Sequence, residues 1–460
     1  MNTLKTPIRE KKSFAKRYIE KRLFTASKKV LEKYKPKVVA ITGSVGKTST
    51  RQAIFTVLNL HEGVLQSSEN YNNEIGVPLT ILGEVSPKRN IAGWLGVFWR
   101  AKKLLWEHDP EYPKVLILEV GIDEVGDMDY LMKLVTPDVG VLTAIGISHL
   151  AKFGTQENLT REKRKLVQAV RQGGYSLLNA DNDLARQSAS VAAGTVVTYG
   201  FRNGSDLVAS DVTTTQRTLS DSQEERELAA VGFPLGVSFK VQYQGKNVPF
   251  YLHRVLGKHQ ILPVLPAIIC GTIFGMNLVE ISEALKQYVP PRGRMNLISG
   301  IKGSLIIDDT YNAAPDSTLE ALKALKEMKT PGRRVAILSD MLELGEKTEE
   351  SHRAAGKAAA DSCDVLIAFG NASVFIAEEA RAAGMDPKNV HYVTEGAHDK
   401  IEQIIQNWIK KGDVLLVKGS QSMRMEKVVY KLMSHPEHAE RLLVRHTPRW
   451  LAKPFEMPQG

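Results

Sequence analysis

The residues best suited to chemistry stand in the segment 43–50, GSVGKTST, directly after a short apolar run. Gly43 and Gly46 let the backbone turn tightly and aim its N–H groups inward, Lys47 supplies a mobile positive charge, and the Thr48 hydroxyl suits Mg²⁺. The leading glycine stands two residues later than in the full G-x-x-x-x-G-K-[ST] spacing. The pattern predicts a loop that holds the phosphates of a nucleoside triphosphate.

Further polar residues follow other apolar runs. Glu119 ends VLILE, where a carboxylate can hold Mg²⁺ opposite Thr48, although a capping or salt-bridged Glu is the alternative. His149 comes after DVGVLTA, and a loop His is more often a surface residue than a ligand. Lys163 stands in REKRK, which in isolation is typical of a solvated charge run. The segment 308–312, DDTYN, offers acceptors suited to ribose hydroxyls or a cation.

Apolar runs that alternate with helical segments predict an α/β fold. The first buried strands are expected at 115–119, 138–144, 175–179 and 195–199, with a helix at 51–60. Polar alternation predicts a β-rich excursion at 206–254 with an exposed loop at 213–226. After the Pro-Pro-Arg-Gly cluster at 290–293, the runs LIIDD, RVAILSD, VLIAFG and VLLVKG predict a second, Rossmann-like domain. Open α/β sheets bind ligands at the carboxyl ends of strands, where the polar residues stand.

The 460 residues predict two or three domains, and no apolar run is long enough for a membrane span or a signal core, so we expect an intracellular protein. Through residue 38 there are thirteen Lys or Arg and three Glu, whereas the remaining residues hold 48 of each sign. Residues 13–34 predict a basic amphipathic helix. It either packs on the next domain or contacts an anionic membrane or nucleic acid.

Nine ordered motifs resemble those of the Mur ligases. They are TGSVGKTST, NYNNEIGVPLT at 70–80, LEVG at 118–121, HLAKFGT at 149–155, GKHQ at 257–260, GRM at 293–295, DDTYNAAPDS at 308–317, SDMLELG at 339–345 and VKGS at 417–420. The likeness is greatest to the MurF type, which joins D-alanyl-D-alanine to a UDP-muramoyl tripeptide. The resemblance implies an ATP-dependent peptide ligase of peptidoglycan precursor synthesis that works through an acyl phosphate.

The resemblance also implies roles for single residues. Lys163 would react with CO₂ to form a carbamate, which requires a neutral amine and hence a depressed pKa, with Arg164 and Lys165 disfavouring a further charge. Two Mg²⁺ ions would be held by Thr48, Glu119, His149 and the modified Lys163. Nucleotide contacts are expected at Gly43, Ser44, Gly46, Lys47, Thr48, Ser49, Arg294, Asp309, Tyr311 and Asn312. Substrate contacts are expected at Asn72, Asn73, Lys418 and Ser420.

The predicted organisation is a basic helical leader at 1–37, a central ATP-binding domain at 38–292 and a C-terminal Rossmann-like domain at 293–460. The resemblance does not extend to the family's usual N-terminal UDP-binding domain, so we expect that domain to be missing and UDP recognition to be in doubt. An insert at 84–114 contains IAGWLGVFWRAKKLLW. Such an aromatic, basic helix suits a membrane interface or a partner groove, and core packing is an equal alternative.

Four residues depart from the family's motifs. Gln260 and Pro263 stand where asparagines are expected, which puts the adenine contacts in doubt. Ala151 replaces an acidic residue, and Gln421 replaces an arginine, which weakens the assignment of the amine donor. The leader and the insert together lead to the hypothesis of a cytoplasmic ligase that contacts the anionic inner face of the membrane peripherally. Its acceptor would be a small-molecule or lipid-linked peptide-sugar.

Two other functions remain open. One is a Mur-like ligase for a different peptide or polymer acceptor, and the other is a nucleotide-binding scaffold without ligase activity. Lys47, Thr48, Glu119, His149 and Lys163 together favour an enzyme, because a binding module does not need the carbamate lysine. A nucleic-acid-dependent ATPase is disfavoured, since no base-stacking motif accompanies the basic leader. The sequence does not predict the oligomeric state.

Overall fold

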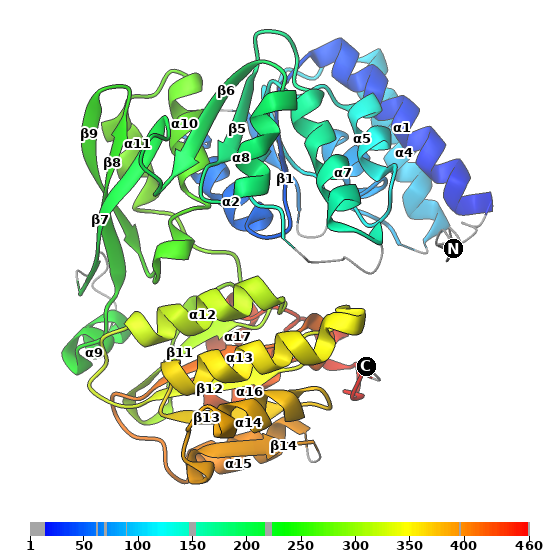
Figure 1. The fold of residues 1–460 in the computed structure, drawn as a ribbon. Helices are drawn as coiled ribbons and strands as arrows, with labels where there is room; N and C mark the ends of the chain where they lie inside the picture. Colours follow the sequence, from blue (N-terminus) through cyan, green and yellow to red (C-terminus); the bar gives the residue numbers. More distant parts are fainter. Residues whose placement is uncertain are drawn as a thin grey trace, which may run out of the picture. The chain divides into compact units, whose positions relative to one another are not determined.

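The computed structural model describes residues 14–60, 63–68, 71–88, 90–146, 153–216, 223–394 and 397–458. His149 and Ala151 lie outside these ranges. The chain divides into two compact units (Figure 1). The first unit comprises Met1–Val208 and Pro263–Ile281, and the second comprises Ala209–Leu262 and Ser282–Gly460.

A parallel sheet forms the centre of the first unit, with the strand order β2-β3-β1-β4-β5-β6-β7. Its strands are β1 (Lys37–Thr42), β2 (Val64–Gln66), β3 (Val115–Glu119), β4 (Val139–Leu142), β5 (Tyr175–Asn179), β6 (Thr195–Gly200) and the start of β7 (Leu207–Thr215). The central strands are apolar along their whole length, as expected of parallel strands covered by helices on both faces. The carboxyl ends of β1, β3 and β4 lie side by side, because β1 pairs with both neighbours.

Helices cover this sheet. They are α1 (Phe14–Tyr34), α2 (Lys47–Leu58), α3 (Gly76–Ile81), α4 (Ile91–Trp106), α5 (Asp127–Leu134), α7 (Gln156–Gln168), α8 (Asp183–Gln187) and α10 (Leu265–Ile273). One core joins α1, α3, α4, α5 and α7 to alternate strand residues such as Ala40, Leu116 and Leu118. Helix α2, which starts at the predicted phosphate loop, packs against α10.

The second unit begins with a hairpin and continues into a sheet. Antiparallel strands β8 (Gly236–Tyr243) and β9 (Lys246–His253) follow α9 (Gln223–Val231). The sheet has the order β10-β11-β15-β12-β13-β14, in which β10 is antiparallel to β11 and the other pairs are parallel. Its strands are β10 (Asn296–Gly300), β11 (Ser304–Asp309), β12 (Arg334–Ser339), β13 (Val365–Phe369), β14 (Val390–Val393) and β15 (Val414–Lys418).

Helices again lie on both faces of this second sheet, because its strands divide their apolar residues between two cores. The helices are α12 (Pro315–Glu327), α13 (Thr348–Ser362), α14 (Ser373–Ala382), α15 (Ala397–Gln406), α16 (Glu426–Leu432), α17 (Ala439–Leu442) and α18 (Pro448–Leu451), and α11 (Leu278–Leu285) spans the boundary of the two units. Strands β11 and β15 are neighbours, so their carboxyl ends meet.

The predicted α/β fold class is confirmed. The strands expected at 115–119 and 175–179 are β3 and β5, and the basic and aromatic helices expected at 13–34 and in the insert are α1 and α4. The β-rich excursion expected at 206–254 contains β7, β8 and β9. The described ends of the stretch 213–226, where the sequence predicts a loop, belong to β7 and α9, and residues 217–222 lie outside the described ranges. The predicted domain limits stay a prediction. Within the described ranges, the structure contains no helix with the length and apolar character of a membrane span.

Candidate active site

The loop between β1 and α2 is held in shape by the end of β4. Ser44 donates its backbone N–H to the carbonyl oxygen of Ala144 at 2.7 Å, and the hydroxyl of Thr143 donates to the carbonyl oxygen of Val45 at 2.6 Å. A Cβ on Gly43, whose φ is +155°, would lie 1.9 Å from the Thr143 hydroxyl oxygen. Only glycine therefore fits at the first turn of the loop, and the N-terminus of α2 follows it directly.

Two lysine side chains converge on one carbonyl of this loop. The Nζ atoms of Lys47 and Lys163 lie 2.7 and 3.0 Å from the carbonyl oxygen of Gly43. Lys163 stands on α7 and is buried. Burial, and next the positive charge of Lys47, hold the pKa of Lys163 well below its usual value, against a smaller opposing effect of the Asp123 carboxylate. The sequence prediction that Lys163 has a depressed pKa agrees with this direction.

The neighbours that the sequence suggested as the cause are not the cause. Arg164 donates through Nε to the hydroxyl of Ser188 at 3.0 Å, and Lys165 forms an ion pair of 2.6 Å with Glu162. Successive residues of a helix point in different directions, so these two cations face other partners than Lys163 does. The positive charge that acts on Lys163 comes from Lys47 at the start of α2, and not from the neighbours of Lys163 on α7.

A carboxylate and a hydroxyl meet at the end of β3. The Thr48 hydroxyl donates to Oε1 of Glu119 at 3.4 Å, and the Asn72 side-chain amide donates to the same oxygen at 3.3 Å. Thr48 and Glu119 are both buried. Carboxylate and hydroxyl oxygens are the ligand types that Mg²⁺ prefers, so this pair fits a magnesium site beside the loop.

Among the described residues, no three or more His, Cys, Asp or Glu side chains lie together in a group that could hold a metal ion. The predicted ligands of the two Mg²⁺ ions differ from such a cluster. They are a hydroxyl, a carboxylate, a lysine that must first be modified, and His149, which lies outside the described ranges. The complete metal set therefore stays a prediction, of which the structure places Thr48, Glu119 and Lys163.

The two predicted substrate asparagines have different partners. Asn72 bonds to Glu119, whereas Oδ1 of Asn73 accepts the backbone N–H groups of Ile75 and Gly76 at 3.2 and 3.0 Å. Asn73 therefore satisfies N–H groups at the start of α3, in the manner of a helix cap. Asn72 is the one whose side chain reaches the predicted magnesium ligand.

A second cluster of predicted residues stands at the ends of β11 and β15. Nζ of Lys418 lies 2.6 Å from Oδ2 of Asp309 and 3.0 Å from the carbonyl oxygen of Asn312. Asp309 and Lys418 are partners in the strand register, which sets their side chains next to each other. The Ser420 hydroxyl accepts the backbone N–H of Leu342 at 2.9 Å. These bonds join β11, β15 and the end of β12 at one edge of the sheet.

Arg294 and Tyr311 form a third contact in the second unit. The guanidinium carbon of Arg294 lies 4.1 Å from the centroid of the Tyr311 ring, which is a cation–π distance. The backbone N–H of Tyr311 donates to the carbonyl oxygen of Gly293 at 2.9 Å, and a Cβ on Gly293 would lie 2.8 Å from that nitrogen. The structure therefore brings the predicted nucleotide residues Arg294 and Tyr311 together.

The sequence did not point to Arg445 and Glu426. These residues hold the segment 310–311 through its backbone carbonyl oxygens. Arg445 donates through Nη2 to the carbonyl oxygen of Thr310 and through Nη1 to that of Tyr311, the latter at 3.2 Å. Its guanidinium is oriented by Glu426, with 3.0 Å between Nη2 and Oε2. Glu426 also pairs with Arg424 at 2.5 Å. No local pattern marks Arg445, because the carbonyl oxygen of Thr310 that it contacts stands 135 residues earlier in the chain.

His259 is a further residue that the sequence reading did not single out. It lies in the 3-10 turn Lys258–Gln260 within range of the charges of Asp309 and Lys418. Burial lowers the pKa of His259 to about 4, and the Asp309 carboxylate opposes that shift. The imidazole is therefore neutral at physiological pH and can serve as a hydrogen-bonding group beside the Asp309–Lys418 pair.

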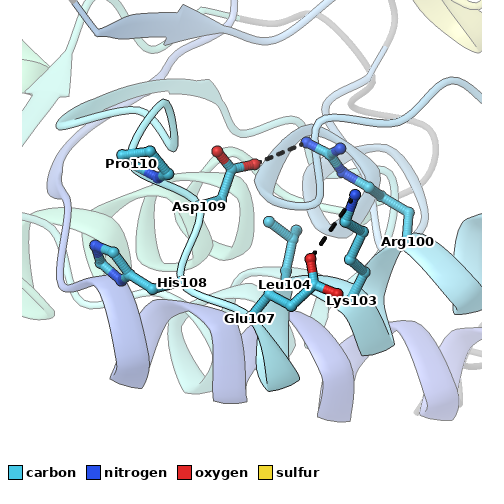
Figure 2. A pocket seen from close by; sticks show the side chains of 7 residues that line it. All are labelled: Arg100, Lys103, Leu104, Glu107, His108, Asp109 and Pro110. Atoms are coloured by element: carbon cyan, nitrogen blue, oxygen red, sulfur yellow. Dashed lines mark hydrogen bonds and ion pairs between the residues drawn. The ribbon is translucent and has the colours of Figure 1, made fainter.

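Figure 2 shows a hollow at the C-terminal end of α4 in the first unit. Its charged side chains are paired with one another, Arg100 with Asp109 at 3.2 Å and Lys103 with Glu107 at 3.8 Å. None of the seven residues that line it is a predicted site residue. We therefore take two candidate sites, one in each unit, rather than this hollow. They are the cluster of Gly43, Lys47, Thr48, Glu119 and Lys163 in the first unit and the strand-end cluster of Asp309, Lys418 and Ser420 in the second.

Two models of Mur ligase domains match the chain. The Mur ligase middle domain matches residues 41–92 and 99–271, and the Mur ligase glutamate ligase domain matches residues 293–421. The chain belongs to the Mur ligase family. The family prediction is thereby confirmed, and the site residues described above fall within the matched segments, apart from Arg424, Glu426 and Arg445.

Named Mur ligases that resemble the chain are UDP-N-acetylmuramoyl-tripeptide–D-alanyl-D-alanine ligases. The Bacillus subtilis enzyme is 28% identical over 411 residues, which cover 89% of this chain and 79% of that protein. The Escherichia coli enzyme is 28% identical over 401 residues, which cover 87% and 77%. Both relatives are ligases of the MurF type, which is the type that the motifs of this chain suggested.

Solved Mur ligases share the fold. MurF from Acinetobacter baumannii has a TM-score of 0.70 at 23% identity, over 89% of this chain and 79% of that one. MurF from Thermotoga maritima, solved in complex with ADP, has a TM-score of 0.71 at 22% identity, over 96% and 88%. The likeness extends over both compact units.

Proposed function

We propose that this Mur ligase is an ATP-dependent peptide ligase that joins D-alanyl-D-alanine to a UDP-muramoyl tripeptide. The observation that carries the proposal is the convergence of Lys47 and Lys163 on the Gly43 carbonyl, beside the Thr48–Glu119 pair. Family matches over most of the chain and relatives named as this ligase support it. A scaffold that only binds nucleotide has no need of a buried lysine with a depressed pKa.

The proposed nucleotide contacts follow from the loop. The backbone N–H groups of residues 43–46 and the N-terminus of α2 attract the phosphates, and Lys47 neutralises the γ-phosphate. In the second unit, Arg294, Asp309, Tyr311 and Asn312 are the proposed contacts of the nucleoside. The ADP complex of the Thermotoga maritima relative supports a nucleotide in a protein of this fold.

In the proposed reaction, a carboxylate oxygen of the tripeptide attacks the γ-phosphorus of ATP. The bond to the β-phosphate oxygen breaks, which leaves ADP and an acyl phosphate. The amine of the second substrate then attacks the acyl carbon, phosphate leaves, and the amine loses a proton. A carboxylate and a γ-phosphate repel each other, so positive charge must be supplied where they meet. Lys47 supplies part of that charge.

Two Mg²⁺ ions would supply the remaining charge when bound, by polarising phosphate oxygens. Thr48, Glu119 and His149 are the proposed protein ligands. Lys163 becomes a further ligand if its neutral amine attacks CO₂, forms an N–C bond and releases a proton. The depressed pKa increases the fraction of neutral amine, which is the form that reacts with CO₂. Asn72 fixes the orientation of the Glu119 carboxylate.

Phosphate release tests the proposal. The purified protein is given ATP, Mg²⁺ and bicarbonate with UDP-muramoyl tripeptide, D-alanyl-D-alanine, both or neither. We expect release that requires both substrates and is lost in Lys163→Ala, with Lys165→Ala as a matched control that retains it. ATP binding without release under any combination would contradict the ligase and favour a scaffold, and release with other acceptors only would overturn the proposed substrate.

A further inference from the structure

Helix α4 is apolar on two opposite faces. One face packs into the core through Val97, Ala101 and Leu104, which are buried. The opposite face carries large apolar side chains at intervals of about one or two turns. Their exposed fractions are 79% for Ile91, 67% for Leu95, 65% for Trp99 and 76% for Trp106. These four residues, here called the α4 stripe, run the full length of the helix.

The α4 stripe belongs to a well-formed element rather than to a frayed segment. The Asn90 side chain caps the helix by accepting the N–H of Gly93 at 3.2 Å. At the other end, Lys33 of α1 donates to the carbonyl oxygen of Leu104 at 2.7 Å, and Tyr34 donates to the same oxygen at 3.0 Å. Single exposed apolar residues are ordinary, but a contiguous row on a fixed helix marks an interaction surface.

Helix α1 lies beside α4 and runs in the same direction (Figure 1). The C-terminal turns of the two helices are joined by the bonds of Lys33 and Tyr34, and further back the guanidinium of Arg22 lies 5.7 Å from the ring of Phe98. Phe14 and Tyr18 of α1 are also exposed. The two helices therefore form one continuous surface, here called the α1–α4 face.

The α1–α4 face is strongly basic. The two helices contain ten Lys or Arg and two Glu, of which Glu20 is buried. The exposed cations are Lys16, Arg17, Lys21, Arg22, Lys28, Lys29, Lys33, Lys102 and Lys103. Nζ of Lys102 lies 3.9 Å from the ring centroid of Trp106, so cations and aromatic rings alternate on the surface. Acidic side chains gather at the C-terminal end of α4, at Glu107 and Asp109, where each is paired (Figure 2).

Both helices lie wholly or partly outside the match to the middle-domain model. Helix α1 precedes residue 41, where the middle-domain match begins, and that match omits residues 93–98 inside α4. Neither helix contributes a residue to the candidate active site. ATP binding and ligation do not explain the exposed features of the α1–α4 face.

We propose that the α1–α4 face docks on an anionic lipid bilayer, with the α4 stripe at the boundary of headgroups and acyl chains and the lysines at the lipid phosphates. Aromatic and aliphatic side chains flanked by Lys and Arg are the chemistry that an anionic interface recognises. A second copy of the chain fits less well, because two such faces would set like charges against each other. The proposal concerns a surface separate from the ligase site and does not depend on the ligase reaction.

Vesicle flotation of the purified full-length protein tests the proposal. The vesicles consist of phosphatidylcholine alone, or of phosphatidylcholine and phosphatidylglycerol in equal parts. We expect the protein to float with the anionic vesicles only, and high salt to weaken binding because it screens exposed charges. Replacing the stripe (Leu95→Ser, Trp99→Ser, Trp106→Ser) or the charges (Lys21→Ser, Lys28→Ser, Lys29→Ser) should each reduce binding by about tenfold or more.

Matched variants show whether the loss of vesicle binding is specific to the α1–α4 face or follows from any loss of exposed apolar or charged residues. Val279→Ser with Val289→Ser removes two apolar side chains that are 62% and 65% exposed elsewhere, and Lys357→Ser with Lys388→Ser and Lys400→Ser removes three exposed lysines of the second unit. Both controls should float like the parent protein, and circular dichroism should show that all variants are folded.

Three results would overturn the proposal. The first is equal flotation of the stripe variant and the parent protein. The second is equal binding of the parent protein to neutral and anionic vesicles. The third combines two observations: the parent protein fails to float, and it sediments as a dimer that the stripe variant converts to a monomer. That result would assign the face to a second copy of the chain.

Discussion

Lys47 and Lys163 donate to the same acceptor, the carbonyl oxygen of Gly43, although Gly43 and Lys163 are 120 residues apart in the chain. Two ammonium groups this close disfavour each other's charge, and the buried lysine is the one whose pKa falls. The phosphate loop therefore has a second effect, because its lysine helps to keep Lys163 in the neutral form that a reaction with CO₂ requires.

Lys47→Met should raise the pKa of Lys163 by removing the neighbouring charge. The neutral amine fraction then appears only at higher pH, so the carbamate signal in ¹³C NMR after addition of ¹³C-bicarbonate should begin at higher pH than in the parent protein. Lys165→Ala is the matched control, because Lys165 pairs with Glu162 and does not act on Lys163. An unchanged onset in Lys47→Met would show that burial alone sets the pKa.

Glu119→Gln should reduce phosphate release by about a hundredfold or more and raise the Mg²⁺ concentration needed, because it removes the charge of a predicted ligand and keeps the side-chain shape. Asn72→Ala should shift the Mg²⁺ dependence in the same direction by a smaller factor, since Asn72 only orients Glu119. Titration of phosphate release with Mg²⁺ measures both. An unchanged Mg²⁺ dependence in Glu119→Gln would remove Glu119 from the metal set.

Asn73→Ala should instead lower stability. Its side chain satisfies two N–H groups at the start of α3, and loss of a helix cap costs about 0.5–2 kcal/mol. The free energy of unfolding in urea should fall by that amount, while the KM values of both substrates stay as in the parent protein. A raised KM for the peptide substrate at unchanged stability would favour the predicted substrate contact.

Arg445→Met should weaken ATP binding although Arg445 is a positioning residue. Its guanidinium bridges Glu426 to the Thr310 and Tyr311 carbonyl oxygens, and loss of Arg445 leaves the buried Glu426 carboxylate with Arg424 as its remaining ion-pair partner among the described residues. We expect the KM for ATP to rise about tenfold, and Arg445→Lys to fail to restore it, because a lysine lacks the fork of donors.

A double-mutant cycle with Glu426→Gln checks that Arg445 acts through Glu426. The two substitutions should be clearly non-additive in their effect on the KM for ATP, since they share one network. Arg441→Met, at an exposed arginine on α17, is the control and should leave that KM unchanged. Additive effects of Arg445→Met and Glu426→Gln would contradict the positioning role.

The sequence predicted those parts of the site that are local in the chain. The Gly43–Thr48 turn, and Glu119 at the end of a strand, follow from short patterns, because strand, turn and helix signals are themselves local. The pairing of Lys163 with Lys47, rather than with its neighbours in REKRK, was missed because it depends on how α7 packs on the sheet. The same holds for Arg445, whose partners are distant in the chain.

The fold of the insert at 84–114 could also be predicted only in part from the sequence. The sequence predicted the aromatic helix but left core packing and surface contact equally open, because large apolar residues occur on both sides of it. The structure resolves this by burying Val97 and exposing Trp99 and Trp106. Helix existence is a local property, whereas the choice of the buried face depends on α1, which is distant in the sequence.

Asp308 should make the stability of the second unit depend on pH. Burial raises its pKa to about 7, and Oδ2 has no hydrogen-bond partner among the described residues, while Oδ1 accepts the N–H and hydroxyl of Thr310. In the unfolded chain the pKa is near 3.8. Between these values the folded protein holds a proton that the unfolded chain has lost, so this contribution to stability is present at low pH and disappears as the pH rises towards 7.

Asp308→Asn should remove this dependence, because the amide cannot ionise and its oxygen can still accept from Thr310. Relative to the parent protein, the free energy of unfolding in urea should rise with pH between about 4 and 7, by up to about 4 kcal/mol. Asp361→Asn changes an exposed carboxylate paired with Lys326 and serves as the control for net charge. Parallel pH profiles of Asp308→Asn and the parent protein would mean that Asp308 ionises in the folded state without cost.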